Sequence, residues 1–369
     1  MKHTKNTTSS WAPPHCPNPN CIHHNNTDDH WPFKKIGYFR RLQTPSRIQR
    51  FTCKTCKRSF STQTFAASYW QKRPDLDAAI LMKTVGCMAN RQIARDLNVS
   101  PKTIDRHLSR MARHCMLFHS QMMQHSPPVH EIVVDGFETF EFSQYYPIHH
   151  HVAIDKETDF FLYFTDSELR RKGRMTEAQK RRRQELEMKL GRPDPKAIEK
   201  DMREVLEVVL KRTDNVIVHS DDHKAYQRSM KTLATEISHR ITPGSEHRDK
   251  NNLLWVVNLL DLLIRHSSAN HKRETIAWSK RRQASAERLV ILLVWRNYMK
   301  GRREKKRGSP TPAMERGMMD RPLAIAELFG GRIFRTRCEL PPRWAEYYDR
   351  RVETRALPRN RGHELKMAY

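Results

Sequence analysis

Between residues 131 and 268 the chain alternates short apolar stretches with longer amphipathic ones, and this order restricts the fold more than any other feature. Short apolar runs are typical of buried strands, whereas apolar residues at a 3.6-residue period are typical of helices. The order predicts an α/β domain of three strands, a helix, a strand, a helix, a strand and a helix. The strands are predicted at 131–136, 145–154, 159–165, 215–220 and 235–239, and the helices at 195–211, from 222, and at 252–268.

Three aspartates occupy distinctive positions in this predicted domain. Asp135 ends the first strand, Asp221 ends the fourth, and Asp261 lies within the last helix. If the first and fourth strands pair, the first two carboxylates are neighbours and the helix can bring the third to them. This element order is that of a ribonuclease-H-like fold. Shared carboxylates suit two Mg²⁺ ions, which can stabilise the attacking and leaving oxygens of phosphodiester transfer.

Four of the seven cysteines form two close pairs, Cys16 with Cys21 and Cys53 with Cys56. Two short loops that each carry two thiolates can supply the four tetrahedral ligands of Zn²⁺. Unligated cysteines and a disulfide are the alternatives, but a reducing cytosol disfavours the disulfide. The sequence therefore predicts a structural zinc site. Three nearby histidines are alternative ligands: His15, His23 and His24.

Residues 77–115 combine helical periodicity with signals for helix starts. Ser100 followed by Pro101 predicts the start of a third helix after a short turn, and Asn90 is predicted to cap the second. This pattern is typical of a helix-turn-helix, whose second helix lies in the DNA major groove; an ordinary helical hairpin is the alternative. Five side chains are expected to face bases or phosphates: Lys102, Thr103, Asp105, Arg106 and His107.

The 369 residues include 68 Lys and Arg against 41 Asp and Glu, a net charge of +27. A cationic surface gains free energy by displacing counterions from a polyphosphate, so nucleic acid is the expected partner. The sequence has no run of 18 apolar residues and no signal-peptide pattern, so we expect no membrane span and a cytosolic location. Basic charge alone does not separate DNA-binding from RNA-binding proteins.

Three blocks resemble the catalytic segments of bacterial insertion-sequence transposases in the DDE/D superfamily: VVDGF, HSDDHKAY and VNLLDLLIRHSSANHKRETIAWSKRR. The cysteine pairs and the helix-turn-helix are similar to the same group, and the resemblance covers most of residues 16–300. It implies that Asp135, Asp221 and Asp261 hold Mg²⁺ or Mn²⁺ and are catalytic, with Tyr226 following the second acid. In that family the third acid is often Glu, and position 261 departs from this pattern.

The resemblance also implies an activity and partners. The implied activity is metal-dependent cleavage and joining of double-stranded DNA at transposon ends and target. Both ends must be held together, so at least a homodimer is expected, in the bacterial cytoplasm at the nucleoid. A catalytically inactive, transposase-derived DNA-binding regulator and a metal-dependent nuclease of the same fold are the competing functions. Acids at all three expected places favour the enzyme over the regulator.

Each acid also has a structural alternative. An aspartate that ends a strand often belongs to a turn or caps a helix, and Asp222 competes with Asp221 for the second position. Asp261 lies in an apolar helix, where a carboxylate must pair or bind metal, and Arg265 one turn later could pair with it. Three other residues are candidates for the third acid: Asp249, Glu246 and Glu274.

The sequence predicts four regions. They are a zinc ribbon at 12–65, a helix-turn-helix domain at 73–120, a ribonuclease-H-like catalytic domain at 128–300, and a basic C-terminal tail at 301–369 whose first part is expected to be mobile. The catalytic domain carries a basic helical insertion at about 168–212. Near its end, Lys280, Arg281 and Arg282 are predicted to bind the transposon end.

Overall fold

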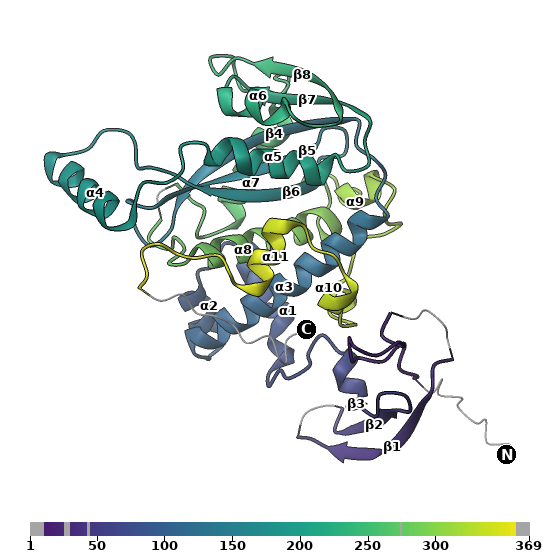
Figure 1. Ribbon diagram of the computed structural model, residues 1–369. Helices are drawn as coiled ribbons and strands as arrows, with labels where there is room; N and C mark the ends of the chain where they lie inside the picture. Colours follow the sequence, from purple (N-terminus) through teal and green to yellow (C-terminus); the bar gives the residue numbers. More distant parts are fainter. Residues whose placement is uncertain (1–10, 26–29, 43–44, 274, 359–369) are drawn as a thin grey trace.

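The computed structural model describes residues 11–25, 30–42, 45–273 and 275–358, and its described part is a mixed α/β protein with two sheets (Figure 1). The smaller sheet lies apart from the main body and is antiparallel, in the order β1-β2-β3. Its strands are β1 (Phe33–Arg40), β2 (Arg47–Cys53) and β3 (Ser59–Ser61). A small core of Trp31, Phe51, Phe60 and the paired cysteines holds it together.

Three helices follow at the predicted positions: α1 (Asp77–Val85), α2 (Asn90–Asp96) and α3 (Pro101–Gln124). The start of α3 is as predicted, because the Ser100 hydroxyl accepts a hydrogen bond from the Thr103 backbone amide at 3.2 Å. The predicted capping role of Asn90 is wrong. The cap position is Ala89, and Asn90 is already helical, so its side chain instead donates to Asp105 and accepts from Arg288.

The larger sheet has five strands in the order β6-β5-β4-β7-β8. Strands β4, β5 and β6 form an antiparallel meander, β7 pairs parallel to β4, and β8 pairs parallel to β7. This mixed sheet is consistent with the ribonuclease-H-like arrangement that the element order predicts. The strands are β4 (Glu131–Phe140), β5 (Pro147–Asp155), β6 (Phe161–Glu168), β7 (Asn215–Asp221) and β8 (Glu236–Thr242).

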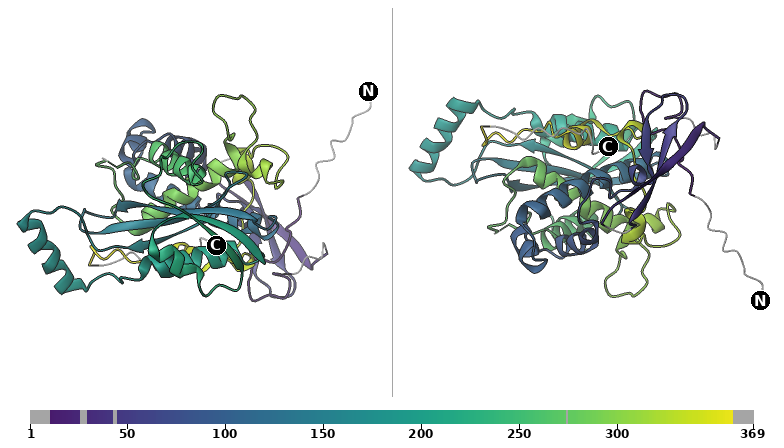
Figure 2. Two further views of the ribbon diagram at one scale, coloured as in Figure 1. Left: turned by 90° about the horizontal axis from the view of Figure 1, so that it is seen from above. Right: turned by 90° about the horizontal axis from the view of Figure 1, so that it is seen from below.

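Helices cover both faces of this sheet (Figure 2). On one face, α5 (Ala197–Val209) packs on β5 and β6, and α6 (Lys224–Met230) packs on α5. On the other face lie α7 (Trp255–Ser267), which contacts β4 and β5, and α8 (Arg282–Val294), which contacts α3 and α7. A single π turn, Trp295–Met299, continues α8. Helix α4 (Glu177–Leu190) projects from the body, and none of its residues is buried (Figure 1).

One hydrophobic core extends from Leu76 to Val352 and so crosses two of the predicted domain boundaries. The middle of α3 contributes Met111, Cys115 and Met116 to this core. The C-terminal residues contribute through three short helices, α9 (Pro312–Glu315), α10 (Ile325–Leu328) and α11 (Pro342–Asp349). The four-region division therefore stays a prediction, while the packing joins helices α1 to α3, the sheet and the C-terminal segment.

The expected mobile start of the C-terminal tail is instead anchored at both ends. Arg302 Nε lies 2.6 Å from Asp159 Oδ2, and Arg316 Nη1 lies 2.5 Å from Asp155 Oδ2. Between these two arginines Ala313 is fully buried. No local pattern predicts this anchoring, because the acids lie about 150 residues earlier, Asp155 at the end of β5 and Asp159 in the turn that follows.

Arg282, which was predicted to bind DNA, is buried and serves the fold. Its guanidinium makes a bidentate ion pair with Asp166 of β6, at 2.7 Å from Nε to Oδ2 and 2.9 Å from Nη2 to Oδ1. The Tyr347 hydroxyl donates to the same carboxylate at 2.5 Å. This cluster joins β6, α8 and α11, so Arg282 is not available to a transposon end.

We predict that Arg282→Met lowers the free energy of unfolding by about 3–5 kcal/mol, because the buried Asp166 carboxylate loses its main partner. Denaturant titration followed by circular dichroism measures the change. Lys280→Met is the matched control: Lys280 is exposed, and its loss is expected to cost less than about 1 kcal/mol. Equal stability of the Arg282→Met variant and the wild type would contradict a structural role.

Candidate active site and metal centre

The pairing of β4 with β7 brings Asp135 and Asp221 level with each other. The last paired residues of the two strands are Val133 and His219, and each aspartate lies two residues further along its own strand. Side chains two residues apart in a strand point to the same face. Both carboxylates therefore belong to the same face of the sheet, and α7 packs against β4.

The surroundings of Asp135 disfavour its charged form. Its pKa is raised to about 7, chiefly by burial and also by the nearby carboxylates of Asp221 and Asp261, against a hydrogen bond from the Gly136 amide and the charge of Arg248. Like charges act over short distances in a partly buried site. The three acids therefore lie close enough for their charges to affect one another. The positive charge of Arg248 offsets this repulsion only in part.

Asp221 and Asp222 differ in their surroundings. Asp221 is half-buried at the end of β7, and its Oδ1 accepts a hydrogen bond from the His223 amide at 3.0 Å. Asp222 is exposed. This difference favours Asp221 as the inward-facing acid of the pair.

Asp261 has one oxygen paired and one without a partner. Its Oδ2 accepts from Arg265 Nε at 3.1 Å, which is the salt bridge expected as the alternative to metal binding. Its Oδ1 is buried and has no hydrogen-bond partner among the described residues. A buried carboxylate oxygen without a partner is costly, so this atom suits a cation. The amide nitrogen of Asn258, one turn earlier on α7, is likewise buried without a partner in the described part.

The rival candidates for the third acid fall elsewhere. Glu246 is exposed in the loop after β8, and Asp249 in the same loop accepts from the Asn251 amide. Glu274 lies outside the described residues. Among the acids considered for this position, Asp261 is the one whose charge acts on Asp135.

Gly136, His149 and Tyr226 form a contact beside the acids that the sequence alone does not predict. A Cβ atom at position 136 would lie 2.0 Å from His149 Nε2, so only glycine lets the imidazole pack there. The same Nε2 lies 3.4 Å from the Tyr226 hydroxyl. Burial raises the pKa of Tyr226, and Asp135 and Asp221 raise it further, which places the phenol near both acids. The signal in the sequence is the glycine that directly follows the strand aspartate.

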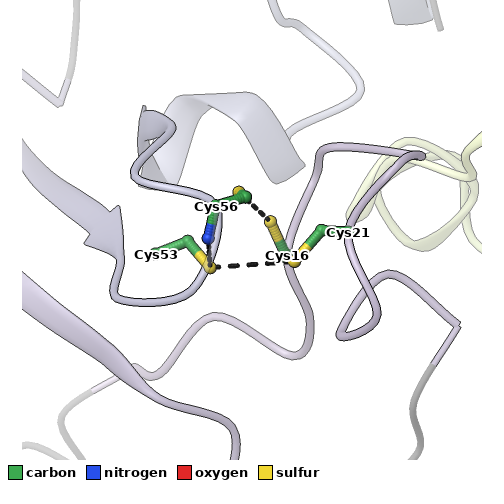
Figure 3. Close-up of side chains that lie close together, drawn as sticks. All are labelled: Cys16, Cys21, Cys53 and Cys56. Atoms are coloured by element: carbon green, nitrogen blue, oxygen red, sulfur yellow. Dashed lines mark hydrogen bonds between the residues drawn. The ribbon is translucent and has the colours of Figure 1, made fainter.

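The four paired cysteines converge in one cluster (Figure 3). The Sγ atoms of Cys16 and Cys56 are 3.6 Å apart, and those of Cys21 and Cys53 are 3.8 Å apart. Four thiolates at Zn–S distances of about 2.3 Å around a tetrahedral ion lie about 3.8 Å from one another. The donor set and the spacing therefore fit a closed zinc site, and all four cysteines are free thiols.

The neighbouring histidines are not part of this cluster. His24 Nδ1 bonds to the Cys16 carbonyl at 2.8 Å, and its Nε2 bonds to Thr336 at 2.8 Å. His15 Nδ1 bonds to the same carbonyl at 3.0 Å. These contacts tie the ribbon loops together and to the C-terminal segment.

The aspartates form a more open group than the cysteines. In the part of the chain that the structure describes, only the cysteines bring three or more ligand atoms within 4.8 Å of one another. Two cations about 3.5–4 Å apart, each with oxygen ligands at about 2.1 Å, need a wider set of acids than one ion does. The oxygen-only donor set and the unpartnered Asp261 Oδ1 fit hard divalent cations such as Mg²⁺.

The predicted DNA-facing side chains of α3 divide into two groups. Lys102 and Arg106 are exposed and Thr103 is half-buried, so they can reach a ligand. Asp105 is also exposed, but it accepts a hydrogen bond from Asn90. His107 is buried, and its Nδ1 lies 2.6 Å from Asp77 Oδ1 of α1. The prediction for His107 is therefore wrong, because this residue faces α1 rather than solvent.

The predicted cations before α8 also differ from one another. Lys280 is exposed, and its ammonium lies 3.6 Å from the centre of the Trp278 ring. Arg281 is half-buried, and Arg282 is buried in the ion pair described above. Of the three, Lys280 is the residue most open to a nucleic acid.

Comparison with known proteins gives no match to a protein-family model or to a curated protein. Solved structures give remote matches. One is a simian T-cell lymphotropic virus intasome in complex with PP2A regulatory subunit B56 gamma, at 13% identity and a TM-score of 0.26 over 67% of this chain and 74% of that chain. Another is the catalytic domain of Mos1 mariner transposase, at 14% identity and a TM-score of 0.19 over 50% of this chain and 87% of that chain.

A third match is a Mos1 transposase paired-end complex with the left transposon end, at 15% identity and a TM-score of 0.15 over 44% of this chain and 57% of that chain. At this low identity and TM-score, the matches do not indicate what the chain does.

In the described part of the chain, no helix is both long and apolar enough to cross a membrane.

We predict one tightly held zinc ion per chain. Metal analysis of purified protein should give a 1:1 ratio in the wild type and lose it in Cys53→Ser, because three thiolates leave the tetrahedron incomplete. Cys87→Ser, a half-buried cysteine outside the cluster, is the matched control and should keep the metal. Loss of zinc should expose the ribbon to proteolysis, since its core is small. Full metal content in Cys53→Ser would contradict the site.

We predict that Asp135→Asn stabilises the metal-free protein at pH 8 by at least about 1 kcal/mol, the equivalent of roughly one pKa unit. Because the folded protein holds the Asp135 pKa at about 7, above its usual 3.8, it binds a proton that the unfolded chain has released, and stability falls as pH rises through this range. The gain should vanish near pH 4.

The same variant tests for a divalent cation. Mg²⁺ should raise the melting temperature of the wild type and of Asp222→Asn, but not of Asp135→Asn, since binding to the folded state alone stabilises it. An equal effect of Mg²⁺ on all three proteins would place the ion away from Asp135.

Proposed function

We propose that this protein is a DNA transposase of the DDE/D type, which cleaves and joins DNA at the three carboxylates Asp135, Asp221 and Asp261. The observation that carries the proposal is the level position of Asp135 and Asp221 on adjacent parallel strands, with the unpartnered Asp261 Oδ1 on the helix over the same face. Phosphodiester transfer needs this kind of shared oxygen-ligand set.

The three acids would hold two Mg²⁺ or Mn²⁺ ions, which supply activation of the attacking oxygen and stabilisation of the leaving oxygen. The chain itself orients the acids. Strand pairing fixes Asp135 and Asp221, and Arg265 holds one oxygen of Asp261 so that the other keeps its direction. Protonated Asp135 would lose its proton on binding a cation, because a positive charge favours the carboxylate.

Residues that precede the five-stranded sheet in the chain are proposed to bind the DNA. Lys102 and Arg106 on α3 are exposed and cationic, which suits contacts to phosphates or base edges. The zinc ribbon would add a second contact to the same transposon end. Because two ends must be joined, we propose that the active species is at least a homodimer on double-stranded DNA in the bacterial cytoplasm.

The test is strand cleavage and joining on labelled duplexes taken from both sides of the protein's own reading frame, with Mg²⁺ or Mn²⁺. We expect Asp135→Asn, Asp221→Asn and Asp261→Asn each to lower both activities by at least about 100-fold while DNA binding persists. Asp222→Asn, the exposed neighbour, is the matched control and should keep most activity.

The other outcomes identify other functions. Cleavage without any joining would make the protein a metal-dependent nuclease. Wild type that binds DNA and never cuts it would be a transposase-derived regulator. If Asp261→Asn alone stays active, the third ligand lies elsewhere, and Glu274 and Asp249 are the next variants to test.

A further inference from the structure

Residues 169–193, here called the basic arm, leave the sheet after β6 and return before α5, with α4 at the outer end (Figures 1 and 2). The arm contains ten Lys and Arg residues and three Glu residues, a net charge of +7. No residue of α4 is buried; four are half-buried and the rest are exposed, the four being Gln179, Arg183, Leu186 and Glu187. The arm is therefore a strongly cationic projection that the catalytic proposal does not use.

Ion pairs centred on Glu187 hold the base of the arm in place. Glu187 Oε1 lies 2.7 Å from Arg170 Nε, and its two oxygens also lie 3.5 Å from Arg183 Nε and 2.9 Å from Arg192 Nε. Arg355 donates to the carbonyls of Leu190 and Gly191, both at 2.6 Å, at the C-terminal end of α4. A 14-residue helix without an apolar face is marginal on its own, so these contacts fix its direction.

Four cations of the arm take no part in these contacts. They are exposed, and within the described ranges none of them forms an ion pair: Lys172, Arg174, Arg181 and Lys189. Among the large apolar side chains of the arm only Met188 and Leu190 are exposed, so an apolar protein partner has little to bury. Charge without apolar surface suits a polyanion whose contacts are phosphates.

The arm emerges at the catalytic end of the sheet. The end of β6 pairs with the start of β5, which also pairs with the end of β4 at Phe140. Asp135 lies five residues before Phe140, about 17 Å along the strand. Helix α4 adds about 21 Å of length. At about 3.4 Å per base pair, the arm thus reaches phosphates roughly 5–11 base pairs from a bond placed at Asp135.

We propose that the basic arm binds the backbone phosphates of the duplex that is cut at Asp135, on one side of the cleaved bond. The placement relative to the cut rests on the proposed function, whereas the phosphate contacts do not. The arm is expected to bind DNA without sequence specificity, because contacts of Lys and Arg to phosphates do not distinguish one base from another.

The first test measures the affinity of full-length protein for a 40-base-pair duplex against salt concentration, in the Asp135→Asn background and without divalent ions. Replacing Lys172, Arg174, Arg181 and Lys189 by Ala should reduce the slope of log K against log salt by about 3–4, since each phosphate contact contributes about 0.9. The substitutions lie on exposed positions, so the melting temperature should stay unchanged.

The matched control removes four exposed cations at the opposite end of the sheet, near Asp159 in the turn between β5 and β6: Arg303, Lys305, Lys306 and Arg307. This control variant has the same net charge as the arm variant and should change the slope by less than about 1. Equal slopes for the two variants, or no change in the arm variant, would overturn the proposal. So would a lower sedimentation mass of the DNA-free arm variant, which would make the arm a subunit contact.

Ethylation interference then maps the contacts. Interference about 5–11 base pairs from the cut should be present for the wild type and absent for the arm variant, whereas interference unchanged by the arm substitutions would overturn the assignment. If the arm changes the salt slope in a protein that never cuts DNA, the phosphate contacts stand and the proposed enzymatic function fails. If cleavage and joining occur and the arm has no effect on the slope, only the arm proposal fails.

Discussion

Parallel pairing of β4 with β7 is the interaction on which the candidate active site depends. It sets Asp135 and Asp221 side by side, although 85 residues separate them in the chain and include the whole basic arm and α5. A one-residue slip in this register would turn one carboxylate to the opposite face of the sheet. The antiparallel meander on one side and β8 on the other keep both strands central, where such a slip is costly.

Burial makes the negative charge of these neighbouring acids unfavourable, so a bound cation would stabilise them. Burial and the two nearby carboxylates of Asp221 and Asp261 raise the pKa of Asp135 to about 7. Arg265 neutralises only one oxygen of Asp261, so the group as a whole has more negative charge than the chain balances. The cysteine cluster differs in kind: it is closed, sulfur-only and distant from the acids, which suits a structural ion.

The positive charge of the chain serves two purposes that composition cannot separate. Arg282 and Arg316 are buried and hold the sheet against the C-terminal segment through acids of β5 and β6. The cations of the basic arm and of α3 are exposed and suit phosphate contacts. The net charge of +27 therefore overstates the surface offered to DNA, since some of the arginines are structural.

Sequence alone determined the elements, because strand and helix periodicity are local properties. It also located Asp221 at a strand end and the cysteines in pairs, since these depend on positions close in the chain. The prediction that Asp135 ends its strand is wrong, because β4 continues to Phe140 through its pairing with β5. Only the tertiary structure decided which charged residues are buried. His107 meets Asp77 from 30 residues away, and Arg282 meets Asp166 from 116 residues away. Such partners are fixed by packing between distant elements, which no local pattern encodes.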